Sequence, residues 1–264
     1  MTWPREWRTA LVTGASSGIG RAFAVALAQR GVDIVAVARR EDRLDELAAE
    51  ISEQHDRTVE PLAADLSDPD GLAAVESRLA DESRPVDILV NAAGFGTAGR
   101  FTDSKVAIEQ KEIDVNISAL MRLTRAAVPA MVARRTGAVV NVSSLAGHQP
   151  LPWWSTYAAT KAYVTSFSRA LAAELRGTGV RVLTLMPGFT RTEFHRNDHF
   201  TPNLIPGPAW MTAEAVADAA LRGLARGRTE SIPGWHMKIV GLASRLSPWP
   251  LTRLVLRLGT RRVW

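Results

Sequence analysis

Two residues with complementary chemistry stand one helical turn apart in the second half of the chain. Tyr157 and Lys161 lie four positions apart in the segment STYAATK, residues 155–161. On a helix, side chains at this spacing share one face. A phenol has an ordinary pKa of about 10, and a nearby ammonium group lowers it by favouring the phenolate. The pair is therefore a candidate for exchanging a proton with a carbonyl or alcohol oxygen, although most such pairs are ordinary helix surface.

A glycine-rich segment near the N-terminus is the second candidate. It reads TGASSGIG over residues 13–20 and separates a short apolar run from an amphipathic one. Glycines allow a tight turn, and the free N–H groups at the start of a helix attract phosphate. Between a strand and a helix, this pattern predicts a dinucleotide site, and the alternative is a glycine-rich turn without a ligand. The segment lacks the Gly-Lys-Ser/Thr ending of a triphosphate-binding loop, which argues against nucleoside triphosphate hydrolysis.

The end of the next apolar run bears on the type of dinucleotide. An NAD site usually places an acidic residue about 20 residues beyond the glycines, where it holds the ribose hydroxyls. Here Ala38 is followed by Arg39 and Arg40. Guanidinium groups hold a 2′-phosphate through bidentate, charge-assisted hydrogen bonds. We therefore expect NADP (NADPH) rather than NAD, the alternative being two solvated arginines at a strand end.

These residues need regular elements to bring them together. Short apolar runs alternate with longer amphipathic segments along most of the chain. The runs predict strands at 9–13, 33–38, 58–61, 88–91, 137–142 and 181–186, and the amphipathic segments predict helices at 21–29, 43–54, 69–82, 108–134 and 155–176. Such alternation is typical of an α/β fold, a doubly wound (Rossmann-type) parallel β-sheet flanked by helices on both faces. We expect a single domain over residues 5–235, including a substrate loop at 189–210, and a basic helical extension over 236–264.

Composition limits the classes of protein to consider. The chain has 264 residues, of which 46% are hydrophobic, and it has no cysteine. An apolar fraction of this size supports a buried core. The absence of cysteine excludes disulfides and cysteine nucleophiles, and we expect no metal site. The first residues lack the apolar core of a signal peptide and no apolar stretch reaches about 18 residues, so we expect a cytoplasmic protein.

The positive charge is concentrated at the C-terminus. From residue 222 onward there are eight arginines and one lysine against one acid, Glu230. Over residues 251–264, leucine and valine recur on one helical face and arginine on another. Such a helix suits peripheral contact with an anionic membrane, and the alternative is packing on the parent domain or a neighbouring subunit. Nucleic acid is not an expected partner, because the basic residues are not spread over the folded body.

Taken in order, the motifs of residues 8–192 resemble those of the short-chain dehydrogenase/reductase family. The matching motifs are Thr13 to Gly20, Asp65-Leu66, Asn91-Ala92-Ala93-Gly94, Asn116, Asn141-Val142-Ser143-Ser144, Tyr157 with Lys161, and Pro187-Gly188 followed by Thr190 and Thr192. The resemblance implies an NADPH-dependent oxidoreductase that transfers a hydride between nicotinamide and a carbonyl or secondary alcohol. A nucleotide-binding regulatory or scaffold protein that retains the fold is the alternative.

The resemblance also implies roles for individual residues. Tyr157 would be the catalytic acid/base, and Ser144, 13 positions before it, would hydrogen-bond the substrate oxygen. Lys161 would lower the pKa of Tyr157 and hold the nicotinamide ribose, and Asn116 would anchor a water in the proton relay. Ser143 would be structural. The expected cofactor contacts are Gly14, Ser16, Ser17, Gly18, Ile19, Gly20, Arg39, Arg40, Asp65, Leu66, Asn91, Ala92, Ala93, Gly94, Tyr157, Lys161, Pro187, Gly188, Thr190 and Thr192.

Aromatic residues close to these motifs indicate the type of substrate. Phe95, Trp154 and Phe194 are the candidates for lining the mouth of the site. An apolar mouth suits a hydrophobic ketone, aldehyde or secondary alcohol. The alternative is that these rings support loops or a subunit contact. By resemblance, we expect the helices at 108–134 and 155–176 to pair in a homodimer or homotetramer.

Overall fold

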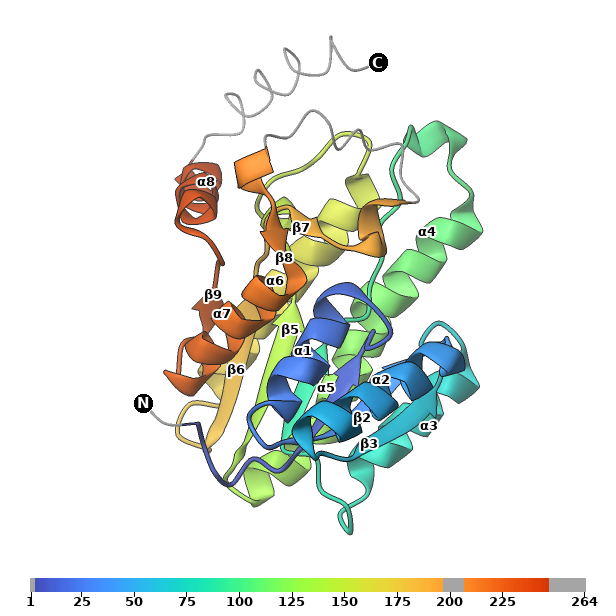
Figure 1. Cartoon of the computed structure of the whole chain (residues 1–264). Helices are drawn as coiled ribbons and strands as arrows, with labels where there is room; N and C mark the ends of the chain where they lie inside the picture. Colours follow the sequence, from blue (N-terminus) through green and yellow to red (C-terminus); the bar gives the residue numbers. More distant parts are fainter. Residues whose placement is uncertain (1–2, 197–206, 247–264) are drawn as a thin grey trace.

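Seven parallel strands form the central sheet in the part of the chain that the computed structural model describes, residues 3–196 and 207–246 (Figure 1). Their spatial order is β3-β2-β1-β4-β5-β6-β9. The strands are β1 (Thr9–Thr13), β2 (Asp33–Ala38), β3 (Val59–Ala63), β4 (Ile88–Asn91), β5 (Gly137–Val142), β6 (Val180–Leu185) and β9 (Glu230–Ser231). The order reverses between β1 and β4, which is where ligands bind in doubly wound sheets.

Helices cover both faces of this sheet, as predicted (Figure 1). One face packs against α1 (Gly18–Ala28), α2 (Glu41–His55) and α7 (Ala213–Ala225). The other packs against α3 (Pro69–Ala80), α5 (Leu120–Ala133) and α6 (Ser155–Glu174), with α4 (Val106–Ile113) leading into α5. Along β1, Ala10 and Val12 contact the first layer and Leu11 the second, and all three are fully buried. Burial on both faces explains why the strands are almost continuously apolar.

The boundaries differ from the predicted ones in a few places. The strand predicted at 58–61 runs from Val59 to Ala63. The helix predicted at 108–134 is α4 and α5 joined by a π-helical segment, Asp114–Ala119, which carries Asn116. Such wider turns within a helix are frequent at functional sites. The two-residue strand β9 was not predicted, and it joins the sheet edge by pairing Thr184 with Glu230.

The C-terminal part adds a small pair of strands and a last helix. β7 (Thr190–Arg191) pairs with β8 (Met211–Thr212), and α8 (Trp235–Leu246) follows β9. The predicted amphipathic segment at 251–264, and with it the membrane contact, lies outside the described residues. Within the described residues, no helix is both long and apolar enough to cross a membrane.

Candidate active site

A cleft of about 1020 Å³ opens at the carboxyl edge of the sheet. Among its lining residues are all the predicted cofactor contacts except Asn91, and three of the four predicted catalytic residues, Ser144, Tyr157 and Lys161. The three predicted substrate residues, Phe95, Trp154 and Phe194, line it as well. Segments more than 100 positions apart in sequence therefore meet in one cavity.

The glycine turn packs closely against its own backbone and against the loop after β4. Gly14 has a φ of +69°, and a Cβ there would lie 3.0 Å from backbone atoms of Ala93. A Cβ on Gly20 would lie 2.3 Å from the carbonyl oxygen of Gly14. The first turn of α1 contains no acidic residue, so its positive dipole end is not compensated locally. This cradle fits the pyrophosphate of a dinucleotide.

The turn is tied to the neighbouring strand by the side chain of Thr13. Its Oγ1 accepts hydrogen bonds from the backbone N–H groups of Ala92 and Ala93, each at 3.0 Å. The same hydroxyl donates to the carbonyl of Val90 at 3.3 Å. Because β1 and β4 flank the point where the strand order reverses, this residue fixes the two walls of the cleft relative to one another.

The end of β2 presents positive charge to the cleft. Arg39 and Arg40 line it, and the Nη2 of Arg40 lies 3.2 Å from Ser16 Oγ and 3.3 Å from Glu193 Oε2. Ser16 belongs to the glycine turn, so Arg40 lies next to the turn that is expected to bind the cofactor's phosphates. Glu193 was not predicted from the sequence, because it comes from a segment far along the chain.

Asp65 and Leu66, two of the predicted cofactor contacts, line the cleft. The Asp65 carboxylate accepts hydrogen bonds from the backbone and hydroxyl of Ser67 at 3.0 and 2.7 Å, and Lys111 Nζ lies 3.1 Å away. Burial opposes ionisation, but the contacts from Ser67 and Lys111 outweigh it and lower the pKa of Asp65 to about 2. Asp65 is therefore a permanent carboxylate that holds its loop in place.

Tyr157 and Lys161 lie together on α6. The Tyr157 ring packs between Trp154 and Phe194, with ring centroids 5.5 Å away in each case. Lys161 Nζ lies 5.7 Å from the centre of the Tyr157 ring and donates to the carbonyl of Val142 at 3.0 Å. Burial lowers the pKa of Lys161 to about 8, and Glu112 opposes this shift. At neutral pH the lysine is therefore a buried cation beside a phenol.

The two adjacent serines have different hydrogen-bond partners. Ser143 Oγ donates to the carbonyl of Lys161 at 2.8 Å and lies 2.6 Å from Thr165 Oγ1, which joins the end of β5 to α6. Ser144 lines the cleft, and its Oγ accepts from the backbone N–H of Ala146 at 3.1 Å. Because Ser144 Oγ acts as the acceptor in that bond, the bond does not use its hydroxyl proton.

Asn116 lies beneath the cleft rather than on its lining. Its Oδ1 accepts from the backbone N–H of Phe95 at 3.1 Å, and its Nδ2 donates to the carbonyl of Phe95 and to Thr160 Oγ1 at 2.8 and 3.0 Å. The side chain therefore fixes the loop after β4 against α6. The water-anchoring role of Asn116 stays a prediction.

Asn91 requires a correction. Its Nδ2 donates to Thr124 Oγ1 at 3.0 Å and to Asn141 Oδ1 at 2.9 Å, and its side chain is buried between β4, β5 and α5. It does not line the cleft. The family resemblance implied a cofactor contact for Asn91, but its side chain is buried in the core.

Glu112 is a buried acid that the sequence reasoning missed. Its Oε2 accepts from the backbone N–H and the hydroxyl of Thr97 at 3.0 and 2.7 Å. Burial raises the pKa of Glu112 to about 7. Thr97 follows Gly96, where a Cβ would lie 2.8 Å from the Tyr157 ring, so Glu112 positions the loop that contacts this tyrosine. Its spacing of four before Asn116, on one helical face, was the available signal.

Helix α8 forms a wall of the cleft that the sequence did not predict. Met237 and Val240 line the cleft, and a Cβ on Gly188 would lie 2.4 Å from Met237 Sδ. Because position 188 is a glycine, α8 can pack directly over this side of the cleft. Only the folded chain brings this helix, more than 70 positions beyond Tyr157, to the site.

Comparison with known proteins gives consistent matches. A family model described as short chain dehydrogenase matches residues 8–201. A short-chain dehydrogenase from Sphingobium yanoikuyae, solved in complex with NADPH, is 40% identical with a TM-score of 0.83, covering 89% of this chain and 91% of that one. The bulky-bulky ketone specific alcohol dehydrogenase from Comamonas testosteroni is 33% identical with a TM-score of 0.78, covering 91% and 95%. A short chain dehydrogenase of Pseudocercospora fijiensis is 42% identical over 195 residues, which span 73% of this chain but 63% of that protein.

Proposed function

The chain belongs to the short-chain dehydrogenase/reductase family and is an oxidoreductase that uses a nicotinamide cofactor, and from this premise we propose that it is an NADPH-dependent reductase of hydrophobic ketones or aldehydes. The same enzyme would run in reverse as a dehydrogenase of secondary alcohols. One observation carries the proposal: Ser144, Tyr157 and Lys161 line the same cleft as the glycine turn and the two arginines.

The residues of the cleft divide the chemistry between them. The nicotinamide, when bound, supplies the hydride. In reduction, Tyr157 gives its phenolic proton to the substrate oxygen. Ser144 donates a hydrogen bond to the same oxygen and stabilises the negative charge that develops there. Lys161, held in place by Val142, stabilises the phenolate that remains.

The preference for NADPH is supported by charge at the end of β2. The strand end has Ala38 where an NAD site would have an acidic residue, and Arg39 and Arg40 line the cleft. A 2′-phosphate would bind to these guanidinium groups, whereas the ribose hydroxyl of NADH offers them no anion. The NADPH complex of the Sphingobium relative is consistent with this assignment.

The substrate class is supported by the walls around Tyr157. Phe95, Trp154 and Phe194 line the cleft, and Met237 and Val240 of α8 add aliphatic surface. Such walls favour a bulky apolar carbonyl. The specificity for bulky-bulky ketones stated for the Comamonas enzyme points the same way.

The experiment that tests the proposal follows loss of reduced nicotinamide absorbance. NADPH and NADH are offered separately against ketones and aldehydes graded in size and polarity. NADPH-specific turnover on bulky apolar carbonyls is the expected result, and equal use of NADH would contradict the role of the arginines. Binding of NADPH without turnover on any carbonyl would favour the alternative, a nucleotide-binding regulatory or scaffold protein.

We further propose that the protein is cytoplasmic and that it assembles as a homodimer or homotetramer. Large apolar side chains are exposed on α4 and α6, including Val106, Ile108 and Tyr163, and Tyr163 stacks on Phe167 at 5.8 Å. An exposed apolar face of this kind suits a subunit contact. Light scattering after size exclusion measures the assembly directly, and a monomer at micromolar concentration would contradict it.

A further inference from the structure

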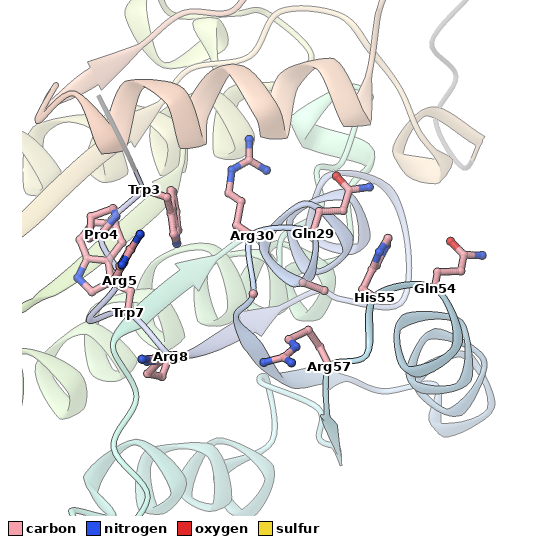
Figure 2. A pocket seen from close by; sticks show the side chains of 12 residues that line it. Trp3, Pro4, Arg5, Trp7, Arg8, Gln29, Arg30, Gln54, His55 and Arg57 are labelled. Carbon is pink, nitrogen blue, oxygen red and sulfur yellow. The ribbon is translucent and has the colours of Figure 1, made fainter.

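A second pocket, shown in Figure 2, lies at the amino-terminal edge of the sheet, whereas the active-site cleft lies at the carboxyl edge. Its volume is about 720 Å³. Three segments build it: residues 3–8 leading into β1, the end of α1 and the end of α2. It shares no lining residue with the cleft, and the proposed oxidoreductase chemistry leaves it unused.

The charge of this pocket is positive. Arg5, Arg8, Arg30 and Arg57 line it together with His55, and no aspartate or glutamate does. In the part of the chain that the structure describes, the side chains of Arg5 and Arg8 have no ion-pair partner. A cationic cavity without lining carboxylates is complementary to an anionic ligand.

The acids near the pocket do not neutralise all of this charge. Arg30 is paired with Asp218 of α7, so its charge is satisfied. Arg57 lies 3.9 Å from Asp56, whose carboxylate is fully exposed, and such a pair is weak. Asp33 and Asp87, which flank the strand starts, accept hydrogen bonds from backbone N–H groups instead. Arg5, Arg8 and Arg57 are therefore the cations available to a ligand.

Two ring nitrogens in the wall of the pocket have no hydrogen-bond partner within residues 3–196 and 207–246. Trp3 Nε1 and His55 Nε2 are buried and have no hydrogen-bond partner among the described residues. An indole N–H is a donor only, and when buried it usually finds an acceptor. The indole N–H adds a donor to those of the lining arginines, and such a set matches a ligand that carries oxygen acceptors.

Aromatic rings form part of the wall. Trp3 and Trp7 pack edge to face with centroids 5.3 Å apart, and Arg30 and Arg181 lie over their faces at 5.7 and 5.2 Å. Trp7 is buried and Trp3 is partly exposed. A wall of fixed indoles beside guanidinium groups favours an anion with a flat organic part over a bare inorganic ion.

We propose that this pocket binds a nucleoside phosphate, with its phosphate groups on Arg5, Arg8 and Arg57 and its base against the Trp3 side of the wall. Guanidinium groups bind phosphate oxygens through paired, charge-assisted hydrogen bonds. The volume lies in the range of sites for small organic ligands. The proposal does not depend on which carbonyl the enzyme reduces.

The test is calorimetric titration of the whole chain with ADP while saturating NADPH occupies the active-site cleft. Pyrophosphate and adenosine are titrated separately as the charged and the aromatic half of the probe. We expect one ADP per chain, bound at least tenfold more tightly than either half. Absence of ADP binding, or pyrophosphate binding as tight as that of ADP, would overturn the assignment of a nucleoside phosphate.

Matched variants locate the site. The double variant Arg5→Gln/Arg8→Gln should weaken ADP binding at least tenfold, and Arg57→Gln, on a different segment, should act in the same direction. Arg176→Gln is the control, because Arg176 is exposed just before β6 at the same edge of the sheet but does not line the pocket. Equal loss in the control, or no loss in either pocket variant, would refute the location. Unchanged NADPH turnover in all of these variants confirms that they remain folded.

Discussion

Replacement of Arg40 by alanine tests the assignment of the cofactor's 2′-phosphate most directly. The Arg40 guanidinium lines the cleft and lies 3.2 Å from Ser16 Oγ, so it is next to the glycine turn that is expected to bind the cofactor's phosphates. Its side chain is 44% exposed, and solvent screens its interactions. A charge-assisted hydrogen bond contributes about 1.5–3 kcal/mol when it is well shielded, so about 1–2 kcal/mol is expected here. That free energy corresponds to about a 5- to 30-fold loss of affinity.

The assay compares the two reduced cofactors with one carbonyl substrate at fixed ionic strength. Arg40→Ala should raise KM for NADPH about 5- to 30-fold and leave KM for NADH nearly unchanged. Arg43→Ala is the matched control, because Arg43 lies one turn further along α2, is 49% exposed, pairs with Glu46 and does not line the cleft. An equal rise for NADPH and NADH, or the same effect in the control, would refute the reasoning.

Three further changes probe the rest of the site. Tyr157→Phe should lower kcat about 10²–10⁴-fold while NADPH still binds, as titration would show, and normal turnover would exclude Tyr157 as the acid/base. Gly20→Ala should abolish cofactor binding, because its Cβ would lie 2.3 Å from a backbone oxygen, whereas Gly223→Ala in α7 has ordinary contacts at 3.7 Å and should leave binding intact. The pKa of Glu112 is raised from 4.5 to about 7, so the wild type should lose stability relative to the Glu112→Gln variant as pH rises from about 4.5 to about 7. The free energy of unfolding should fall by roughly 3 kcal/mol at most. Melting curves of both proteins at pH 5 and pH 8 measure that difference, and a constant gap would contradict it.

The sign of the Glu112 effect follows from proton linkage. The folded protein holds the proton on this carboxyl group up to a higher pH than the unfolded chain does. The unfolded state therefore becomes relatively more favourable as pH rises through this range. Glutamine carries no titrating proton and keeps a carbonyl oxygen that accepts from Thr97, so the comparison isolates the charge.

Local patterns in the sequence were sufficient for most of the fold. Residues of β1, β2, β4 and β5 are apolar because both faces of these strands are buried, and their bounds match the predicted ones. The strand β9 escaped prediction because two residues carry no periodicity. The interruption of the long helix at Asp114–Ala119 also escaped, since a π-helical segment differs from an α-helix in the spacing of its hydrogen bonds, which no residue type marks.

The sequence by itself determined the chemical groups of the site and their order along the chain. The glycine turn, Ser144 and the Tyr157–Lys161 pair are local motifs, and their residue types make them candidates for proton exchange beside a dinucleotide site. The tertiary structure alone decided that Asn91 turns into the core, that Glu112 holds the loop against Tyr157, and that α8 closes the apolar side of the cleft. These outcomes depend on contacts between segments tens of residues apart, and such contacts leave no period or motif in the sequence.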